Sequence, residues 1–103
     1  MKPTTLIDGS TGRVILTGQF TFEVHRDLKD AVYPMLDNPA LQAVSVDLAQ
    51  VTYMDSSSLG ILLLLKEKAE AKGRKVALRN PNATVLRTLE VVQFNRLFEI
   101  QRG

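Results

Sequence analysis

The feature that most constrains the fold is a valine-rich segment that leads into a helical segment, which is followed by another strand-like segment. "AVSVDLAQV" alternates apolar and polar residues and predicts a strand over residues 43–48. "SSLGILLLLKEKAEAKG" predicts a helix, with Gly73 as the residue past its end. "RKVALRN" predicts the next strand. Strands that alternate with helices of this length predict a mostly parallel sheet.

The flanking segments extend this order. "TTLIDGSTGRVILTG" predicts two strands joined by a turn at Asp8–Gly12, with Gly18 closing the second strand. Apolar residues within 20–37 recur at intervals near three and four and predict an amphipathic helix, whose last turn Pro34 should end or bend. "NATVLRTLEVV" predicts a third helix and "LFEI" a last short strand. The expected fold is a single α/β domain over residues 1–103, ordered β-β-α-β-α-β-α-β, with one sheet face poorly covered.

Composition excludes several classes of protein. The chain has 103 residues, of which 45% are apolar and 23% charged, a balance typical of globular proteins. The absence of cysteine rules out disulfides and thiolate chemistry. No apolar h-region follows Lys2, and the apolar run Leu59–Leu65 is far shorter than a membrane span. We therefore expect a cytoplasmic protein without membrane insertion.

Positive charge is concentrated in the last third of the chain. Residues 71–103 carry seven Lys/Arg against two Asp/Glu. Such a segment could meet an acidic partner or nucleic acid. The basic residues are scattered over several elements, however, and the only aromatic residues there, Phe94 and Phe98, are typical of a core. A solvated surface without direct nucleic-acid binding is the better interpretation.

The segment "MDSSSLG" places three serines where a central strand ends and a helix begins. Reaction and ligand sites of open α/β sheets collect at that edge. The simplest interpretation is a helix cap by Asp55 or Ser56. A catalytic serine would need a base, and the only histidine, His25, is far away in the sequence with no G-x-S-x-G motif. One histidine and no cysteine also argue against a metal site, and no P-loop is present, so we expect no cofactor.

A third interpretation of the serines is a phosphorylation site. A phosphoryl group on a serine in the first helical turn adds about −1.5 to −2 charge, which the helix N-terminus accommodates. The fold would stay the same while a strong charge appears beside Asp55. A partner that buries this spot would then be expelled.

The leucine run suggests a docking surface next to the serines. Leu59, Leu62 and Leu63 belong to an apolar set that runs right round the first two helical turns, which is wider than one sheet contact requires. Either the helix packs between the sheet and neighbouring helices, or some leucines are exposed as an interaction patch. We take Leu59, Leu62 and Leu63 as candidates for partner contact.

Most of the chain resembles the STAS domain, and most closely the bacterial anti-sigma factor antagonists. The resemblance rests on the D-L-x-x-V-x-Y-M-D-S-S element that starts at Asp47, the Leu59-Gly60 pair, the "GRKVAL" strand and the closing "V…L…LFEI" pattern. The early "GRVILTGQF" strand extends it to nearly the whole chain. In that fold the helices lie mainly on one side of the sheet.

The resemblance implies a partner-switching protein rather than an enzyme. Unphosphorylated, such a protein binds a GHKL-type serine kinase that also acts as anti-sigma factor, and a PP2C-type serine phosphatase restores this state after phosphorylation. The implied acceptor is Ser56, with Asp55, Ser57, Ser58 and Gly60 around it. Many relatives read D-S-S-G-L-G, so Ser58 replaces a glycine here and adds a third hydroxyl. We expect a monomer when free.

A second role belongs to the same family. Some STAS domains are permanent accessory subunits of lipid-transporting ABC systems, where they bind the ATPase and are not kinase substrates. These often lack a clean D-S-S, which favours the switch for this chain. The fold alone does not decide between the two roles.

Overall fold

The structure is a computed structural model that describes residues 3–102. The element order confirms the predicted β-β-α-β-α-β-α-β arrangement, with two short 3₁₀ turns added. The elements are β1 (Thr4–Asp8), β2 (Thr11–Phe20), η1 (Phe22–Val24), α1 (His25–Leu36), β3 (Ala43–Met54), α2 (Ser56–Ala71), β4 (Lys75–Arg79), α3 (Ala83–Val91), η2 (Phe94–Arg96) and β5 (Glu99–Gln101).

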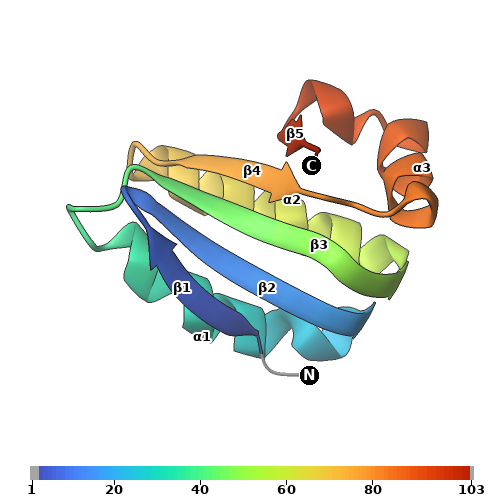
Figure 1. Cartoon of the computed structure of the whole chain (residues 1–103), viewed down its shortest axis with the longest axis horizontal. Coiled ribbons are helices and arrows are strands. Elements are labelled where there is room, and N and C mark those ends of the chain that lie inside the picture. Colours follow the sequence, from blue (N-terminus) through green and yellow to red (C-terminus); the bar gives the residue numbers. More distant parts are fainter. Residues whose placement is uncertain (1–2, 103) are drawn as a thin grey trace.

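The five strands form one sheet in the order β1-β2-β3-β4-β5. β1 and β2 pair antiparallel, whereas β2, β3, β4 and β5 are mutually parallel, as the alternation of strands and helices predicted. Helices α1 and α2 lie side by side behind the sheet, and α3 lies beyond the end of β4 (Figure 1). The domain is a single small α/β unit with its helices mainly on one face.

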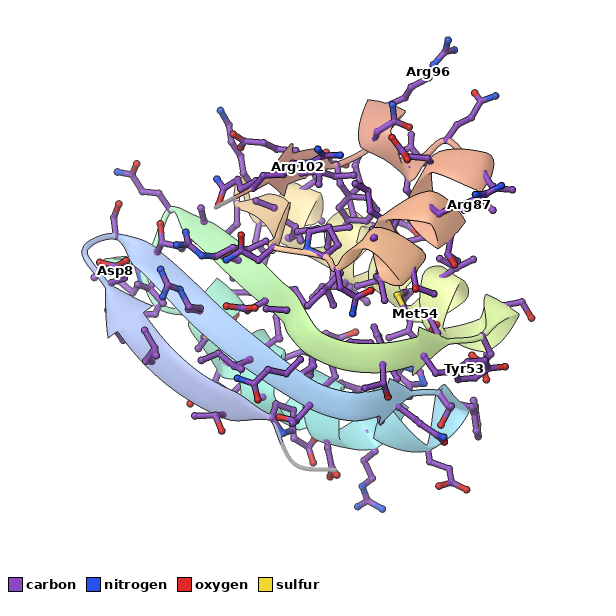
Figure 2. All side chains as sticks on the ribbon, turned by 45° about the vertical axis from the view of Figure 1, so that its right-hand side comes forward. Asp8, Tyr53, Met54, Arg87, Arg96 and Arg102 are labelled. Carbon is purple, nitrogen blue, oxygen red and sulfur yellow. The ribbon has the colours of Figure 1, made fainter. Side chains whose placement is uncertain are left out.

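The opposite face of the sheet carries no helix. Side chains of alternating residues of the strands project from it, and Asp8 marks its edge at the turn between β1 and β2 (Figure 2). This arrangement agrees with the expectation that one face would be poorly covered.

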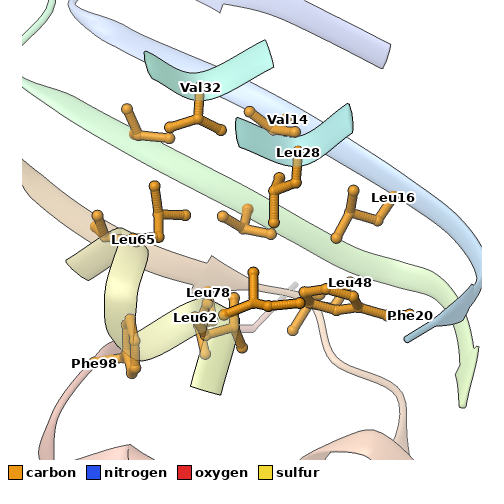
Figure 3. Close-up of a cluster of buried hydrophobic side chains, with 14 of the residues drawn as sticks. Val14, Leu16, Phe20, Leu28, Val32, Leu48, Leu62, Leu65, Leu78 and Phe98 are labelled. Carbon is orange, nitrogen blue, oxygen red and sulfur yellow. The ribbon is translucent and has the colours of Figure 1, made fainter. Parts of the chain in front are cut away.

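The hydrophobic core lies between the sheet and the helix pair α1 and α2 (Figure 3). Alternate residues of β2, β3 and β4 point toward the helices because successive side chains of a strand face opposite sides. The largest fully buried side chains include Leu16, Phe20, Leu28, Leu48, Leu62 and Leu78. Phe94 and Phe98 are also buried, as expected, with ring centroids 5.5 Å apart.

The predicted strand over 43–48 was too short, because β3 continues to Met54. Its buried apolar positions alternate only up to Leu48 and then move to Val51 and Met54. The register with β2 shifts twice over this stretch, so the period of two that predicts a strand is lost there. The strand end therefore lies immediately before the serine segment.

A further expectation about a chain break was wrong. Gly18 does not close β2; it adopts φ +83° beside a register shift, and the strand continues to Phe20. Pro34, by contrast, lies in the last turn of α1 as expected, and the helix ends shortly after it at Leu36. A proline removes one helical hydrogen bond, and the buried Met35 and Leu36 anchor the last turn despite that loss.

Candidate functional site

The serine segment lies at the carboxyl edge of the sheet, directly after the central strand β3. Asp55 separates β3 from α2 and has an extended backbone, with φ −105° and ψ −179°. This conformation is typical of a helix N-cap, and Ser56 is the first residue of the helix. The location agrees with the sequence prediction.

Asp55 is the cap and organises the first turn of α2. Its Oδ1 accepts a hydrogen bond from the Ser58 backbone N–H at 2.9 Å and one from the Ser57 hydroxyl at 2.8 Å. The Ser58 hydroxyl in turn donates to the Asp55 carbonyl oxygen at 2.6 Å. Two of the three hydroxyls are therefore used to build the helix start.

The three serines differ sharply in exposure. Ser58 is completely buried and Ser57 is half-buried, whereas Ser56 is exposed. The Ser56 hydroxyl has no hydrogen-bond partner among residues 3–102. The first backbone N–H groups of a helix lack intrahelical partners and favour negative charge. Ser56 is thus the one accessible hydroxyl at a position suited to an anion.

Acid should weaken this cap. The Ser58 backbone N–H, followed by the Ser57 hydroxyl, lowers the pKa of the Asp55 carboxyl below its ordinary value of 3.8. The ionised carboxylate therefore contributes stability that is complete above its pKa in the unfolded chain, about 3.9, and is lost as the pH falls through the lower folded value. We expect wild type to lose more stability than Asp55→Asn between pH 6 and pH 3, because asparagine also caps helices but does not titrate.

Thermal unfolding followed by circular dichroism at a series of pH values measures this difference. Other carboxyl groups titrate in both proteins, so the difference between the two curves isolates Asp55. Parallel curves for wild type and Asp55→Asn would contradict the proposed cap.

An exposed stripe on α2 begins at Ser56. Gly60, Leu63, Leu64 and Glu67 follow it at helical spacing, and all five residues are exposed. Leu63 is 39% and Leu64 37% exposed. A Cβ at Gly60 would have no neighbour within 4 Å, so this position leaves the helix backbone open to a partner.

One of the predicted contact residues is corrected by the structure. Leu62 is 0% exposed because it points into the core beneath the sheet, so it is not a surface residue. Leu59 is half-buried and packs against the core, while Leu63 is exposed. The helix therefore combines both alternatives for the leucine run: one side packs on the sheet and the other reaches solvent.

Two exposed aromatic residues lie at the same edge and were missed in the sequence. Phe22 is 68% and Tyr53 52% exposed. Tyr53 precedes the last residue of β3 (Figure 2) and pairs with Gln19 of β2. The turn η1, which contains Phe22, packs against α2. Strand alternation could have placed Tyr53 outward once Met54 was assigned to the core; no sequence signal distinguishes Phe22 from the buried Phe20.

These residues define what we call the docking face. It consists of Phe22, Tyr53, Ser56, Leu63 and Leu64. Large exposed apolar side chains on neighbouring elements are typical of a protein contact surface.

The other classes of site find no support in the described chain. His25 begins α1, and its ring meets the edge of Phe22 with centroids 6.4 Å apart. Within residues 3–102 no three His, Cys, Asp or Glu side chains are grouped so that they could hold a metal ion. None of the helices formed by these residues is long and apolar enough to cross a membrane.

Comparison with known proteins decides the family. The family model for "Mlab, STAS domain" matches residues 4–100. The chain belongs to the STAS family. A STAS-domain containing protein of Pseudomonas aeruginosa (strain UCBPP-PA14) is 36% identical to it over 93 residues, which cover 90% of each protein. The resemblance stated from the sequence is thus confirmed.

Solved STAS structures share the fold. An assigned anti-sigma factor antagonist of Thermotoga maritima superposes with a TM-score of 0.85 at 22% identity, covering 98% of this chain and 86% of that one. The Bacillus antagonist SpoIIAA in its unphosphorylated form gives 0.81 at 17% identity, covering 98% and 87%. The STAS domain of a SulP transporter from Vibrio cholerae gives 0.74 at 17% identity, covering 93% and 76%. The shared fold therefore spans antagonists and transporter domains.

Proposed function

We propose that this STAS protein is an anti-sigma factor antagonist whose docking face is switched by phosphorylation of Ser56. The observation that carries the proposal is that the three serines differ in their hydrogen bonds and exposure. Ser57 and Ser58 hydrogen-bond to Asp55, while the Ser56 hydroxyl is exposed and uncommitted. A kinase can reach Ser56 without opening the helix.

Phosphorylation at Ser56 would change the surface more than the fold. A phosphoryl group adds about −1.5 to −2 charge at the N-terminus of α2, where the only acidic side chain of the helix start is the N-cap Asp55. It would stand next to the Asp55 carboxylate and among the apolar side chains of the docking face. A partner that buries this face would have to desolvate the added charge, so its affinity falls.

The partners follow from this role. The unphosphorylated protein binds an anti-sigma factor that is also a GHKL-type serine kinase, and a PP2C-type serine phosphatase reverses the modification. The protein itself acts by binding, in the cytoplasm, and performs no catalysis. SpoIIAA, which shares the fold, is known in both an unphosphorylated and a phosphorylated form, and this supports the proposal.

Paired bait proteins test the switch. Ser56→Ala should retain the anti-sigma kinase in a pull-down from the native host, whereas Ser56→Asp should retain at least tenfold less because its charge mimics the phosphorylated state. Mass spectrometry identifies and quantifies the captured proteins. Ser10→Asp, at an exposed serine in the turn between β1 and β2, is the matched control for added charge and should capture as much kinase as Ser56→Ala. Equal capture of the kinase by Ser56→Ala and Ser56→Asp would refute the proposal.

The second candidate function is an accessory subunit of a lipid-transporting ABC system. The match to the Mlab type of STAS model favours it. In that case the serines would serve as a helix cap, and the ATPase of a transporter would be captured equally by both Ser56 variants. The same pull-down therefore separates the two functions.

A further inference from the structure

The uncovered face of the sheet contains a hollow far from the docking face. Its floor is formed by the small residues Ala43 and Ser45 of β3 and Ala77 of β4. Arg13, Ser45, Ala77 and Glu99 are neighbours across four strands in the pairing register. Because the central residues are short and the flanking ones long, a cavity of about 270 Å³ remains between them.

Two buried hydrogen-bonding atoms in this hollow have no partner within residues 3–102. They are the Ser45 Oγ and the Arg13 Nε. Ser45 is only 4% exposed although no helix covers this face. A buried polar atom without a partner destabilises the fold, so each such atom in a folded protein calls for an explanation.

Both atoms can donate a hydrogen bond, so a ligand that binds them must supply hydrogen-bond acceptors. Arginine Nε–H can only donate, and the Ser45 hydroxyl can donate as well. Arg13 already pairs through Nη2 with Asp8 Oδ2 at 3.1 Å, which fixes the guanidinium on the sheet while its Nε stays free. A ligand that satisfies both atoms must present at least two acceptor oxygens.

The charged residues that line the hollow have a small positive excess: Arg13, Lys75 and Arg79 against Asp8 and Glu99. Lys75 and Arg79 line the hollow, and neither forms an ion pair within the described part of the chain. Glu99 also lines it, and Asp47 stands next to Arg79 in the ladder, where its Oδ1 accepts from the Ala49 N–H. With Asp8 paired to Arg13, the lining keeps two unpaired cations, Lys75 and Arg79, against one unpaired carboxylate, Glu99, together with the two free donors.

We propose that this hollow binds the phosphate group of a small metabolite or free inorganic phosphate. A phosphate presents oxygens in several directions, so it can accept from β2, β3 and β4 at once. The volume lies just below the range of pockets for larger ligands, about 300–1,000 Å³, which limits the ligand to a small molecule. This site is separate from Ser56. Ser45 and Ala77 alternate with the core residues of β3 and β4, so they face away from α1 and α2.

Nuclear magnetic resonance on the ¹⁵N-labelled full chain tests the site. Inorganic phosphate and glycerol 3-phosphate are titrated separately, with sodium chloride at matched ionic strength as reference. The signals to follow are the Arg13 Nε–H and the backbone amides of Ser45 and Ala77. We expect saturable shifts with phosphate compounds and none with chloride; tighter binding of glycerol 3-phosphate identifies a metabolite, and tighter binding of phosphate identifies the ion.

Variants establish where the binding occurs. Ser45→Ala and Arg79→Gln should each weaken the affinity at least fivefold, whereas Arg87→Gln on the distant helix α3 should leave it unchanged. Ser45→Ala should unfold at the same or a higher temperature, because it removes a buried hydroxyl without a partner. Shifts that grow linearly without saturation, or equal affinity in Ser45→Ala, Arg79→Gln and wild type, would overturn the proposal.

Discussion

Replacing Ser58 with aspartate is expected to lower the free energy of unfolding by about 3–5 kcal/mol. Ser58 is completely buried, and its hydroxyl and N–H both bond to Asp55. An aspartate there would bury a second carboxylate beside the first, with no cation in hydrogen-bond contact. Urea unfolding of the purified variants measures the loss.

The matched control is the same substitution two residues earlier. Ser56→Asp places its carboxylate in solvent at the first helical position, where negative charge stabilises a helix by about 0.3–1 kcal/mol. We therefore expect Ser56→Asp to be as stable as wild type or slightly more stable. Similar losses in the two variants would contradict the assignment of Ser56 as the position that tolerates an anion.

The second large effect is expected at Leu62. Leu62→Ala should cost about 2–5 kcal/mol, because it leaves a cavity at a fully buried site. Leu63→Ala, one residue further and 39% exposed, should change stability by only about 0.5 kcal/mol.

For partner binding we expect the reverse order, with the direct effect at Leu63→Ala. Leu63→Ala removes part of the docking face and should weaken capture of the anti-sigma kinase, while stability is kept. Urea unfolding and a binding assay with the identified partner report both effects. Normal binding by a folded Leu63→Ala protein would remove Leu63 from the contact surface.

The fold could be predicted from the sequence because the strand, helix and cap patterns were mutually consistent. Alternating residues in "AVSVDLAQV", the helical segment ahead of Gly73 and the Asp55 cap each indicated an element that the structure contains. The end of β3 was missed because two register shifts break the period of two. Local patterns therefore identified the elements better than their limits.

The site required the tertiary structure. Composition and spacing do not distinguish the three serines, and only the family resemblance singled out Ser56. The burial of Ser58 and the hydrogen bond of Ser57 supply a physical reason for that choice. Likewise, an apolar run that surrounds a helix cannot show that Leu62 faces inward and Leu63 outward.

The hollow on the open sheet face is still less visible in the sequence. It depends on the alignment of Arg13, Ser45 and Ala77 across three strands that are separated along the chain. Pairing register is set by the packed sheet, so no local pattern brings these residues together.

The central claim is that Ser56 is the phosphorylated residue, and mapping the modification tests it most directly. The protein is isolated from its native host and its phosphopeptides are sequenced by mass spectrometry, with a phosphatase-treated sample as control. Phosphate on Ser56, absent after treatment, is the result we predict. Phosphate on Ser57 or Ser58 instead, or none on the segment when the kinase is active, would contradict the account.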